Sequence, residues 1–589
     1  MENLSSNQLP EWDLKDFYSS HKSKEITTDL NSLSVEVKKF SKKFKYNLKK
    51  IKEKDLLKSI GIFEKLEEKI NFIRSYVYLL YSTNQLNQTI LAFYQKTNET
   101  LIDIESDLIF FTLELNFLPD KQIKILSKSK YFPWVKNTRK FKKYQKSEKI
   151  EKILLDKNLT SSNSWIRLFD QTMAGITFDY KNQKVNESEI LNQMSSSTPS
   201  DRKKAAYAFG VGLKKNINTF ALITNTLAKD LEIDRNLRGF KFSESFRHLN
   251  NQVEKKDVDC LTQTVMKNYS SLSHRYYKYK AKAFKTKKLN YWDRNAPYPK
   301  QKDIKISWKE GVRVVLNAYE VFDKRISDIA KKFFENQWIH ATVIKGKSSG
   351  AFSHPTVPSC HPYILINYQN KLRDVMTLAH EIGHGIHQYL ANDKGFLISD
   401  TPLTLAETAS VFGEMLTFKS IFQNAKNIEE KKFILISKIE DMLNTVVRQI
   451  SFFEFERKLH HSRKESELTV NQINDLWLKT QSESLGNSVN LNGNYKYFWS
   501  YIPHFIHSPF YVYAYAFGDC LVNALWYAYQ QSDKDIFSSK YIEMLSSGGT
   551  KSHNDLLKPF NLSAYDNSFW EKGITMITGL MDELDDLDN

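Results

Sequence analysis

The segment TLAHEIGHGIHQYL, residues 377–390, is the feature that most restricts how this chain can fold. If the segment is helical, His380 and His384 lie one turn apart on the same face, where one metal ion can contact both imidazoles. Glu381 projects beside them as a candidate general base, and this H-E-x-x-H spacing is typical of zinc hydrolases. The spacing therefore predicts a helix that supplies two metal ligands and a base.

An ordinary amphipathic core helix is the alternative for this segment. Gly383 and Gly385 argue against it, because each glycine costs about 1 kcal/mol relative to alanine inside a helix. A helix selected only for packing rarely carries both glycines. The segment therefore favours the metal site.

A catalytic zinc site needs a third protein ligand and one position that stays open to water. His387 is a candidate on the same face of the helix. It follows His380 by seven residues, however, and so lies roughly 10 Å further along the helix axis. That distance is long for a compact site, and a ligand from elsewhere in the chain is expected.

The segment TPLTLAETASVFGEML offers two acids for this role, Glu407 and Glu414. Pro402 marks a helix start, and the two acids are seven residues apart, so they share a helix face. We predict Glu407 as the third ligand, because an acid among apolar residues needs a partner. We predict that Glu414 orients a ligand histidine. A capping box with Thr404 is the alternative for Glu407.

Composition fits a large folded protein. The chain has 589 residues, of which 41% are hydrophobic and 13% aromatic, and this excludes wholesale disorder. The three cysteines are too few for a disulfide framework, so a cytoplasmic location is expected. The first residues do not resemble a signal peptide. No apolar run reaches 18 residues, so no membrane partner is expected.

The net charge of +17 raises the question of nucleic-acid binding. Three lysine-rich segments carry the excess: residues 31–60, 136–149 and 275–288. The last two interleave basic and aromatic residues, as single-strand binders do. They are far apart in the sequence, and no recognised nucleic-acid module surrounds them. We therefore interpret them as solvated helix faces and predict no nucleic-acid partner.

The chain is expected to be mainly helical, with two domains. Residues 1–197 are predicted as an N-terminal helical domain that contains a hairpin at 176–185. A serine-rich break ends at Pro199, and residues 198–589 are predicted as the catalytic domain. Glycines and prolines within residues 338–368 exclude a continuous helix there. That segment predicts short strands near 340–344 and 363–368, just before the candidate metal helix.

The motifs together resemble a known family. LAHEIGHGIHQYL followed by LAETASVFGEML resembles the thimet oligopeptidase and oligoendopeptidase F family of zinc metallopeptidases, and more closely its oligoendopeptidase F branch. LPEWDLKDFY, KGKSSGAFSHPTVPSCHPYILINY and IPHFIHSPFYVYAYAFG also resemble this family, so the similarity runs from residue 9 to about 518. The resemblance implies one zinc ion per chain, held by His380, His384 and Glu407, with Glu381 as the base.

The resemblance also implies a fold and a substrate. It implies a mainly α, clam-like, two-lobed structure with a small β-sheet beside the zinc helix and a deep channel for short unstructured peptides. An exposed edge strand of that sheet would pair with the peptide backbone. Gly346 and Gly350 would let the substrate backbone approach closely. Simple turns are the alternative for both glycines.

The oxyanion of peptide hydrolysis needs hydrogen-bond donors. The stretch IPHFIHSPFYVYAYAFG offers His504, His507, Tyr511, Tyr513 and Tyr515. The family uses a histidine and tyrosines in this region, which implies roles for His504, Tyr511 and Tyr513. The alternating tyrosines would suit a strand. In a helix, Tyr511 and Tyr515 share a face and Tyr513 points elsewhere. Core packing is the alternative for each tyrosine.

The predicted function is a zinc-dependent endopeptidase that hydrolyses internal bonds of short peptides. A zinc hydrolase that acts on another amide or on a dipeptide-like substrate is one alternative. A helical binding protein with a relict metal site is another. Glu381 argues against the binding protein, because metal binding alone does not require that carboxylate.

Overall fold

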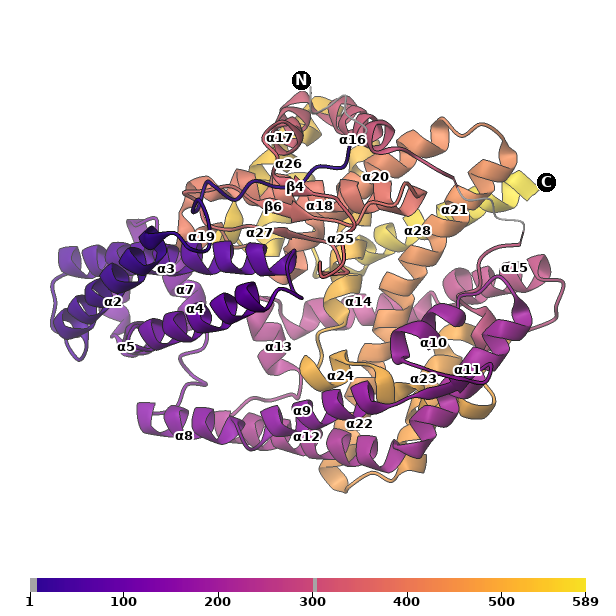
Figure 1. The fold of residues 1–589 in the computed structure, drawn as a ribbon, viewed down its shortest axis with the longest axis horizontal. Coiled ribbons are helices and arrows are strands. Elements are labelled where there is room, and N and C mark those ends of the chain that lie inside the picture. The colour runs from indigo at the N-terminus through magenta and orange to yellow at the C-terminus, as the bar shows by residue number, and fades with distance from the viewer. Residues whose placement is uncertain (1–7, 300–303, 589) are drawn as a thin grey trace. The chain divides into compact units, whose positions relative to one another are not determined.

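The computed structural model describes residues 8–299 and 304–588, and these residues are mainly α-helical with small sheets (Figure 1). The predicted fold class is confirmed in this respect. The contacts divide the chain into two compact units, each built from three separate segments. Unit 1 comprises Met1–Lys143, Asp303–Asn424 and Ala528–Leu562, and unit 2 comprises Tyr144–Lys302, Ala425–Tyr527 and Ser563–Asn589. The predicted boundary near residue 198 falls within unit 2 and stays a prediction, as does the channel.

Unit 1 contains a helical bundle at its N-terminal end and the candidate metal helices. Its main elements are α2 (Lys24–Phe44), α3 (Glu53–Ser82), α4 (Gln88–Ser106), α5 (Ile109–Phe117), α6 (Asp120–Ile125), α7 (Phe132–Arg139), α16 (Trp308–Phe322), α17 (Lys324–Glu335), β4 (Ile339–His340), β5 (Phe352–His354), β6 (Tyr363–Leu365), α18 (Leu372–Ala391), α19 (Phe396–Ser399), α20 (Leu403–Gln423), α26 (Lys534–Leu545) and α27 (His553–Leu557). The apolar stripe of α3 is buried at Ile70, Ile73 and Val77. Burial of this stripe joins α3 to the core of the bundle.

Unit 2 is also helical, with two very small sheets. Its main elements are α8 (Glu148–Asn158), α9 (Ser162–Gly175), β1 (Phe178–Tyr180), β2 (Gln183–Val185), α10 (Glu187–Gln193), α11 (Pro199–Lys215), α12 (Ile217–Arg238), α13 (Ser245–Asn250), α14 (Lys255–Lys267), α15 (Arg275–Ala283), β3 (Leu289–Asn290), α21 (Ile428–Leu443), α22 (Gln449–Glu465), α23 (Val470–Leu485), β7 (Val489–Asn490), α24 (His504–His507), α25 (Tyr513–Gln530, whose last three residues belong to unit 1) and α28 (Asn567–Asp588).

The predicted hairpin is present, and the strand predicted at 363–368 is present as β6, but the strand predicted at 340–344 is limited to β4 and includes only His340 of that range. β1 and β2 form the expected antiparallel hairpin, and the two residues of its turn, Lys181 and Asn182, have φ of 49° and 63°. In unit 1, β6 is the central strand of a three-stranded sheet: it pairs parallel with β4 and antiparallel with β5. β5 is therefore an edge strand. The sheet contacts α18 through β5 and β6.

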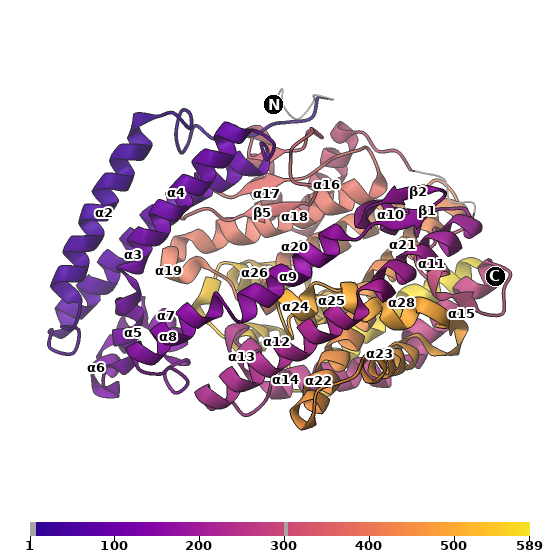
Figure 2. The ribbon, with the colours of Figure 1, turned by 60° about the horizontal axis from the view of Figure 1, so that its bottom comes forward.

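The metal helix α18 is packed among three other helices of unit 1. α16, α17, α18 and α20 lie side by side (Figure 2). A Cβ on Gly383 would lie 2.5 Å from the Ala409 carbonyl oxygen and 2.6 Å from Ser410 Cα, both on α20. A Cβ on Gly385 would lie 2.6 Å from the ring of Phe333 on α17. The two glycines thus permit the close contact of α18 with its neighbours.

We predict that Gly383→Ala lowers the free energy of unfolding by about 1–3 kcal/mol. The added methyl group would press on the backbone of α20, which cannot move without shifting the whole helix. Urea unfolding measures the change in the free energy of unfolding. Gly579→Ala is the matched control, because Gly579 also lies in a helix and a Cβ added there would meet nothing within 4 Å. An unchanged stability of Gly383→Ala would contradict this packing.

The far end of the chain also supports the candidate metal helices. Tyr541 of α26 donates a 2.7 Å hydrogen bond to the carbonyl oxygen of Thr408 on α20. Its ring packs on Phe412 of α20, with the ring centroids 4.7 Å apart. Because Tyr541 is buried, α26 completes the core beneath α20.

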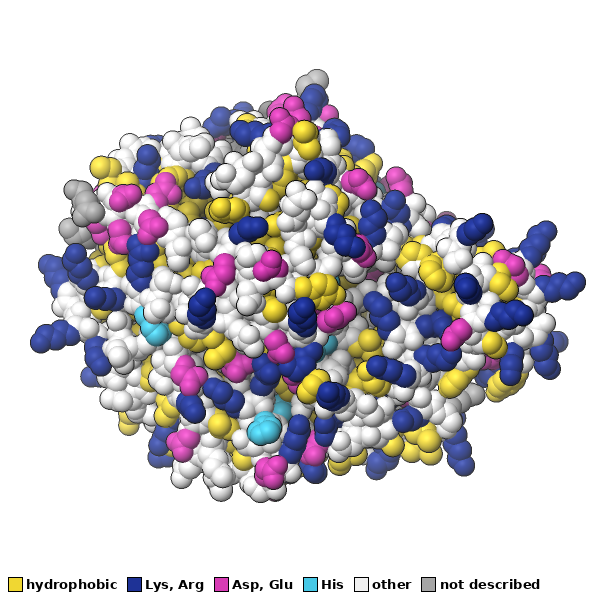
Figure 3. Space-filling model, turned by 180° about the vertical axis from the view of Figure 1, so that it is seen from behind, with side chains coloured by type: hydrophobic (Ala, Val, Ile, Leu, Met, Phe, Trp, Pro, Cys, Tyr) yellow, Lys and Arg dark blue, Asp and Glu magenta, His cyan; other side chains and the backbone are white. Residues whose placement is uncertain are grey.

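On one face of the molecule, basic residues do not gather into a single patch (Figure 3). On the face shown in Figure 3, Lys and Arg side chains are scattered, with Asp and Glu between them. Part of the basic segment 275–288 is paired: Arg275 contacts Asp582 at 2.7 Å and Asp585 at 2.6 Å. The absence of a nucleic-acid partner stays a prediction. Within the described residues, no helix has both the length and the hydropathy needed to cross a bilayer.

Candidate metal centre

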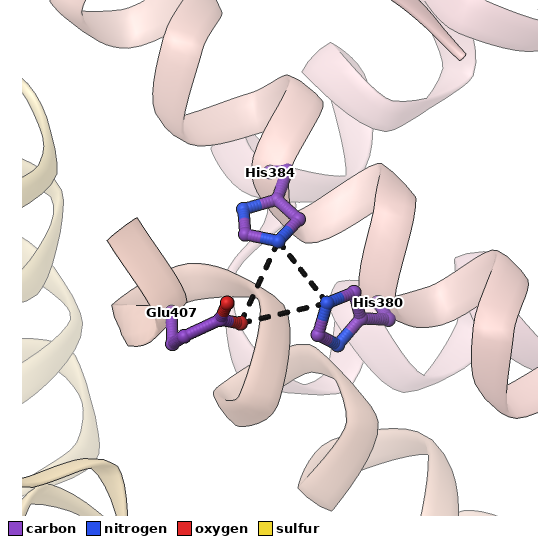
Figure 4. A group of neighbouring side chains, drawn as sticks. All are labelled: His380, His384 and Glu407. Carbon is purple, nitrogen blue, oxygen red and sulfur yellow. Dashed lines mark hydrogen bonds and ion pairs between the residues drawn. The ribbon is translucent and has the colours of Figure 1, made fainter. Parts of the chain in front are cut away.

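The contact between α18 and α20 brings the three predicted ligands together. The Nε2 atoms of His380 and His384 are 3.1 Å apart, and Glu407 Oε2 lies 3.5 Å from each of them (Figure 4). Zinc binds nitrogen and oxygen ligands at about 2.0–2.1 Å with tetrahedral geometry, so two ligands of one ion lie about 3.3 Å apart. The three atoms therefore fit one zinc ion without rearrangement.

The same atoms form the one group of three or more His, Cys, Asp or Glu ligands found within the described residues. His387, the other histidine of the motif, is not part of the group. It is buried, and its Nε2 atom lies 3.5 Å from the hydroxyl of Thr401. Burial, followed by the charge of His384, lowers the pKa of His387 to about 4. Its neutral ring fits a position in the core.

Glu407 is held toward the other two ligands by its own helix. Ser410, one turn later in α20, donates a 2.7 Å hydrogen bond from its hydroxyl to Glu407 Oε2. The N-cap position of α20 is Pro402, and the helix has no side-chain cap there. The alternative capping box of Thr404 with Glu407 is therefore not the arrangement seen.

Glu414 contacts the first histidine from behind, as expected for an acid that orients a ligand. Its Oε1 atom lies 2.5 Å from His380 Nδ1, which leaves Nε2 of the same ring directed at the ligand group. Burial acts to lower the pKa of His380, but the hydrogen bond and charge of Glu414, with Glu407, raise it to about 9.

Glu381 lies on α18 between the two histidines and is 6% exposed. Burial, followed by the negative charges of Glu407 and Glu414, raises its pKa to about 7, against the opposing charge of His380. A hydrogen bond from the backbone of Ser353 on β5 acts in the opposite direction. A carboxyl group with a pKa near neutrality can both accept and release a proton. Sequence reasoning offered no sign of Ser353.

β5 is attached to the metal helix by Gln388 of α18. The Gln388 side chain accepts a 2.8 Å hydrogen bond from the hydroxyl of Ser353 and donates a 3.2 Å hydrogen bond to its carbonyl oxygen. The predicted substrate-binding glycines precede β5. Gly346 has φ of 87°, and its carbonyl oxygen accepts a hydrogen bond from the backbone of Gln85, so it forms a packed turn. Gly350 has nothing within 4 Å of a Cβ position. The proposed contact of either glycine with substrate stays a prediction.

The predicted oxyanion donors lie in unit 2. His504 begins α24, and its Nε2 atom lies 3.2 Å from the hydroxyl of Tyr515 on α25. The rings of Tyr511 and Tyr515 are 5.2 Å apart. Tyr513 points away into the core, where its hydroxyl lies 3.0 Å from His248 Nδ1. Tyr513 and Tyr515 lie in α25, whereas Tyr511 lies in the turn that precedes it, and the Tyr515 hydroxyl contacts His504.

His507, the remaining candidate of this stretch, contacts an acid on another helix. Its Nε2 atom lies 2.8 Å from Asp170 on α9, and its side chain is exposed. The pKa of His504 is lowered by burial and by the charges of Arg448 and His507. A neutral His504 keeps one N–H donor available at neutral pH.

A buried glutamate beside a His–His–Glu cluster on a helical scaffold has the donor set of a metal-dependent hydrolase. The sequence profile described as peptidase family M3 matches residues 192–576, and that of oligopeptidase F matches residues 114–178. The chain belongs to peptidase family M3 and is a peptidase. The family suggested by the sequence motifs is confirmed.

Individual relatives agree with this assignment. The chain is 27% identical to an oligoendopeptidase F homolog of Borreliella burgdorferi, over 92% of both chains. It is 27% identical to oligopeptidase PepF of Bacillus subtilis, over 75% of this chain and 66% of the relative. The crystal structure of oligoendopeptidase F from Enterococcus faecium has a TM-score of 0.71, with 19% identity over 96% of this chain and 99% of that chain. This structural similarity supports the assignment of the fold.

Proposed function

We propose that this protein is a zinc-dependent endopeptidase that hydrolyses internal bonds of short, unstructured peptides. The observation that carries the proposal is the fit of His380, His384 and Glu407 to one zinc ion, beside the buried Glu381. The oligoendopeptidase F names of the relatives support oligopeptides as the substrate class. Three free cysteines support a reducing cytoplasm as its location.

Glu381 acts as the general base of this reaction. When bound, a zinc ion supplies Lewis acidity, which lowers the pKa of water and polarises a carbonyl group. Glu381 accepts the proton of the attacking water and later delivers it to the leaving amine. Glu414 holds the ring of His380 in its ligand orientation throughout.

His504 with Tyr511 and Tyr515 supplies hydrogen bonds to the developing oxyanion. The contact of His504 with the Tyr515 hydroxyl and the packing of the two tyrosine rings support this role. A direct role for Tyr513 stays a prediction. The peptide backbone pairs with the sheet edge at β5, and Gly350 leaves room beside it.

The test is cleavage of an internally quenched peptide that is blocked at both ends. Chelation is expected to abolish cleavage, and added zinc is expected to restore it. Mass spectrometry of the products is expected to show that an internal bond of the peptide was cut. Blocked ends exclude enzymes that need a free terminus. Cleavage that persists after complete metal removal would refute the proposal. A zinc-loaded protein that cuts only free dipeptides would support the alternative hydrolase.

A further inference from the structure

Tyr319 of α16 contacts both helices that carry the candidate ligands. Its hydroxyl donates a 2.9 Å hydrogen bond to the carbonyl oxygen of Ala379 on α18. The same hydroxyl lies against Gly413 of α20. α16, α18 and α20 all belong to unit 1, so these contacts are made within one compact unit. One buried side chain thus contacts α18 and α20 together.

The two positions that Tyr319 contacts each precede a residue of the candidate metal centre. Ala379 precedes His380, a candidate ligand, and Gly413 precedes Glu414. Glu414 Oε1 lies 2.5 Å from His380 Nδ1, and this contact joins the same two helices. The Tyr319 hydroxyl therefore lies against the backbone directly beside both partners of the contact that orients His380.

The Tyr319 hydroxyl occupies the place that a side chain at position 413 would take. A Cβ on Gly413 would lie 1.8 Å from the hydroxyl oxygen of Tyr319 and 2.6 Å from the ring carbon that bears it. Non-bonded heavy atoms do not approach so closely, so a side chain at 413 would displace the ring or separate the helices. Glycine at 413 lets α20 close onto Tyr319, and the hydroxyl limits any closer approach.

The ring of Tyr319 is held in a packed core. Tyr319 is 3% exposed. Phe322, nearly one turn later in α16, packs on Phe412 of α20 with the ring centroids 5.0 Å apart. Phe322 also packs on Tyr541 of α26, with the centroids 5.5 Å apart. Because a close-packed interior leaves little room for a ring to move, the hydroxyl acts as a fixed spacer between α18 and α20.

The hydrogen bond to Ala379 is an additional one for that carbonyl group. In an α-helix, the carbonyl oxygen of residue 379 also accepts from the N–H of residue 383, and a carbonyl oxygen has two lone pairs. Removing the Tyr319 hydroxyl therefore leaves the carbonyl with its helical partner. A phenylalanine at 319 keeps the ring and its packing, so the folded protein is expected to form without the spacer.

We propose that Tyr319 is a positioning residue of the metal centre: its hydroxyl fixes the spacing of α18 and α20 at which Glu414 orients His380. The inference rests on the proposed function, because it takes zinc as the ion that the candidate ligands bind. Tyr319 acts through the backbone at Ala379 and Gly413 and not as a ligand. The spacing matters because hydrogen bonds to a ligand histidine weaken steeply once their geometry is lost.

The experiment measures the zinc affinity of the full chain. Tyr319→Phe removes the hydroxyl and keeps the ring. Metal-free protein is titrated with zinc in competition with a chromophoric chelator, which gives the dissociation constant. Tyr319→Phe is expected to bind zinc about 10-fold more weakly than the unaltered protein, at the lower end of the range for groups that orient a ligand. The visible absorption of bound Co²⁺ reports coordination geometry and is expected to change as well.

Gly413→Ala tests the same spacing from the other helix. Its methyl group would displace the Tyr319 hydroxyl, so zinc affinity is expected to fall by at least about 10-fold. If both substitutions act through one spacing, the double variant loses less affinity than the product of the two single losses. Losses from independent sites would multiply instead.

Tyr368→Phe is the matched control. Tyr368 is also buried, donates a 3.1 Å hydrogen bond to the carbonyl oxygen of Ile306, and lies against a helix glycine, Gly311 of α16. These contacts are made at the start of α16, and the zinc affinity of Tyr368→Phe is expected to equal that of the unaltered protein. Urea unfolding of the metal-free proteins measures the general loss of stability in both phenylalanine variants.

Each outcome decides the proposal. Weaker zinc binding by Tyr319→Phe, with the control unchanged, supports the positioning role. Unaltered zinc affinity in Tyr319→Phe, with a loss of stability like that of the control, would show a purely structural role and overturn the proposal. Losses that multiply in the double variant would also overturn it.

The same measurements separate this inference from the proposed function. A protein whose zinc affinity depends on Tyr319 but that cuts no blocked peptide would overturn the proposed function and keep the positioning role. A protein that cuts the peptide with zinc, and whose zinc affinity is indifferent to Tyr319→Phe, would keep the function and overturn the positioning role. An unaltered protein that binds no zinc would overturn both.

Discussion

Glu381→Gln is expected to lower kcat for peptide cleavage by about 10²- to 10⁴-fold while zinc stays bound. Glutamine has nearly the same shape as glutamate but cannot accept the proton of the attacking water. The proposed metal ligands His380, His384 and Glu407 are untouched, so the zinc content is expected to remain one per chain. Steady-state cleavage of the blocked peptide gives kcat, and elemental analysis gives the zinc content.

The matched control for this loss is Glu335→Gln. Glu335 is the last residue of α17 and is exposed. Its substitution makes the same chemical change outside the group of candidate ligands. Its kcat is expected to equal that of the unaltered protein. A Glu381→Gln protein that holds zinc and turns over at the original rate would show that another group is the base.

His384→Ala is expected to abolish cleavage, with a loss of at least about 10³-fold. It removes one of three protein ligands, and the metal contributes several kcal/mol to stabilising the transition state. The variant is also expected to release zinc during dialysis against conditions that leave the unaltered protein loaded. Zinc content and cleavage rate measured on the same sample test both parts.

Glu414→Gln provides a graded comparison for this ligand removal. Glu414 does not contact the ligand position and acts through Nδ1 of His380. Substitutions of such supporting groups weaken metal affinity or activity by about 10- to 100-fold. Excess zinc is therefore expected to rescue Glu414→Gln but not His384→Ala. Equal rescue of the two variants would contradict their different roles.

The grouping of the candidate ligands could be predicted from the sequence because helical spacing fixes the positions of side chains. His380 and His384 at i and i+4 must share a face, and a carboxylate among apolar residues must have a partner. Glu407 and Glu414 are found where these two rules predict them. The hairpin at β1 and β2 followed from the same kind of local pattern.

Other features depend on contacts that no local pattern contains. The sequence flagged Gly383 as unusual, but the reason is the backbone of α20 at Ala409 and Ser410. The contact of Ser353 with Glu381 depends on how β5 lies along α18. Tyr515 was offered with four other donors, and the contact that singles it out is made by His504.

The contact of α26 with α20 has a consequence for how this protein is made. α26 is synthesised long after the ligands of α18 and α20, yet Tyr541 closes the core beneath α20. A nascent chain on the ribosome therefore carries all three metal donors before the packing that fixes one of their helices exists. The helices that hold the candidate ligands therefore reach their final packing only after α26 has been made.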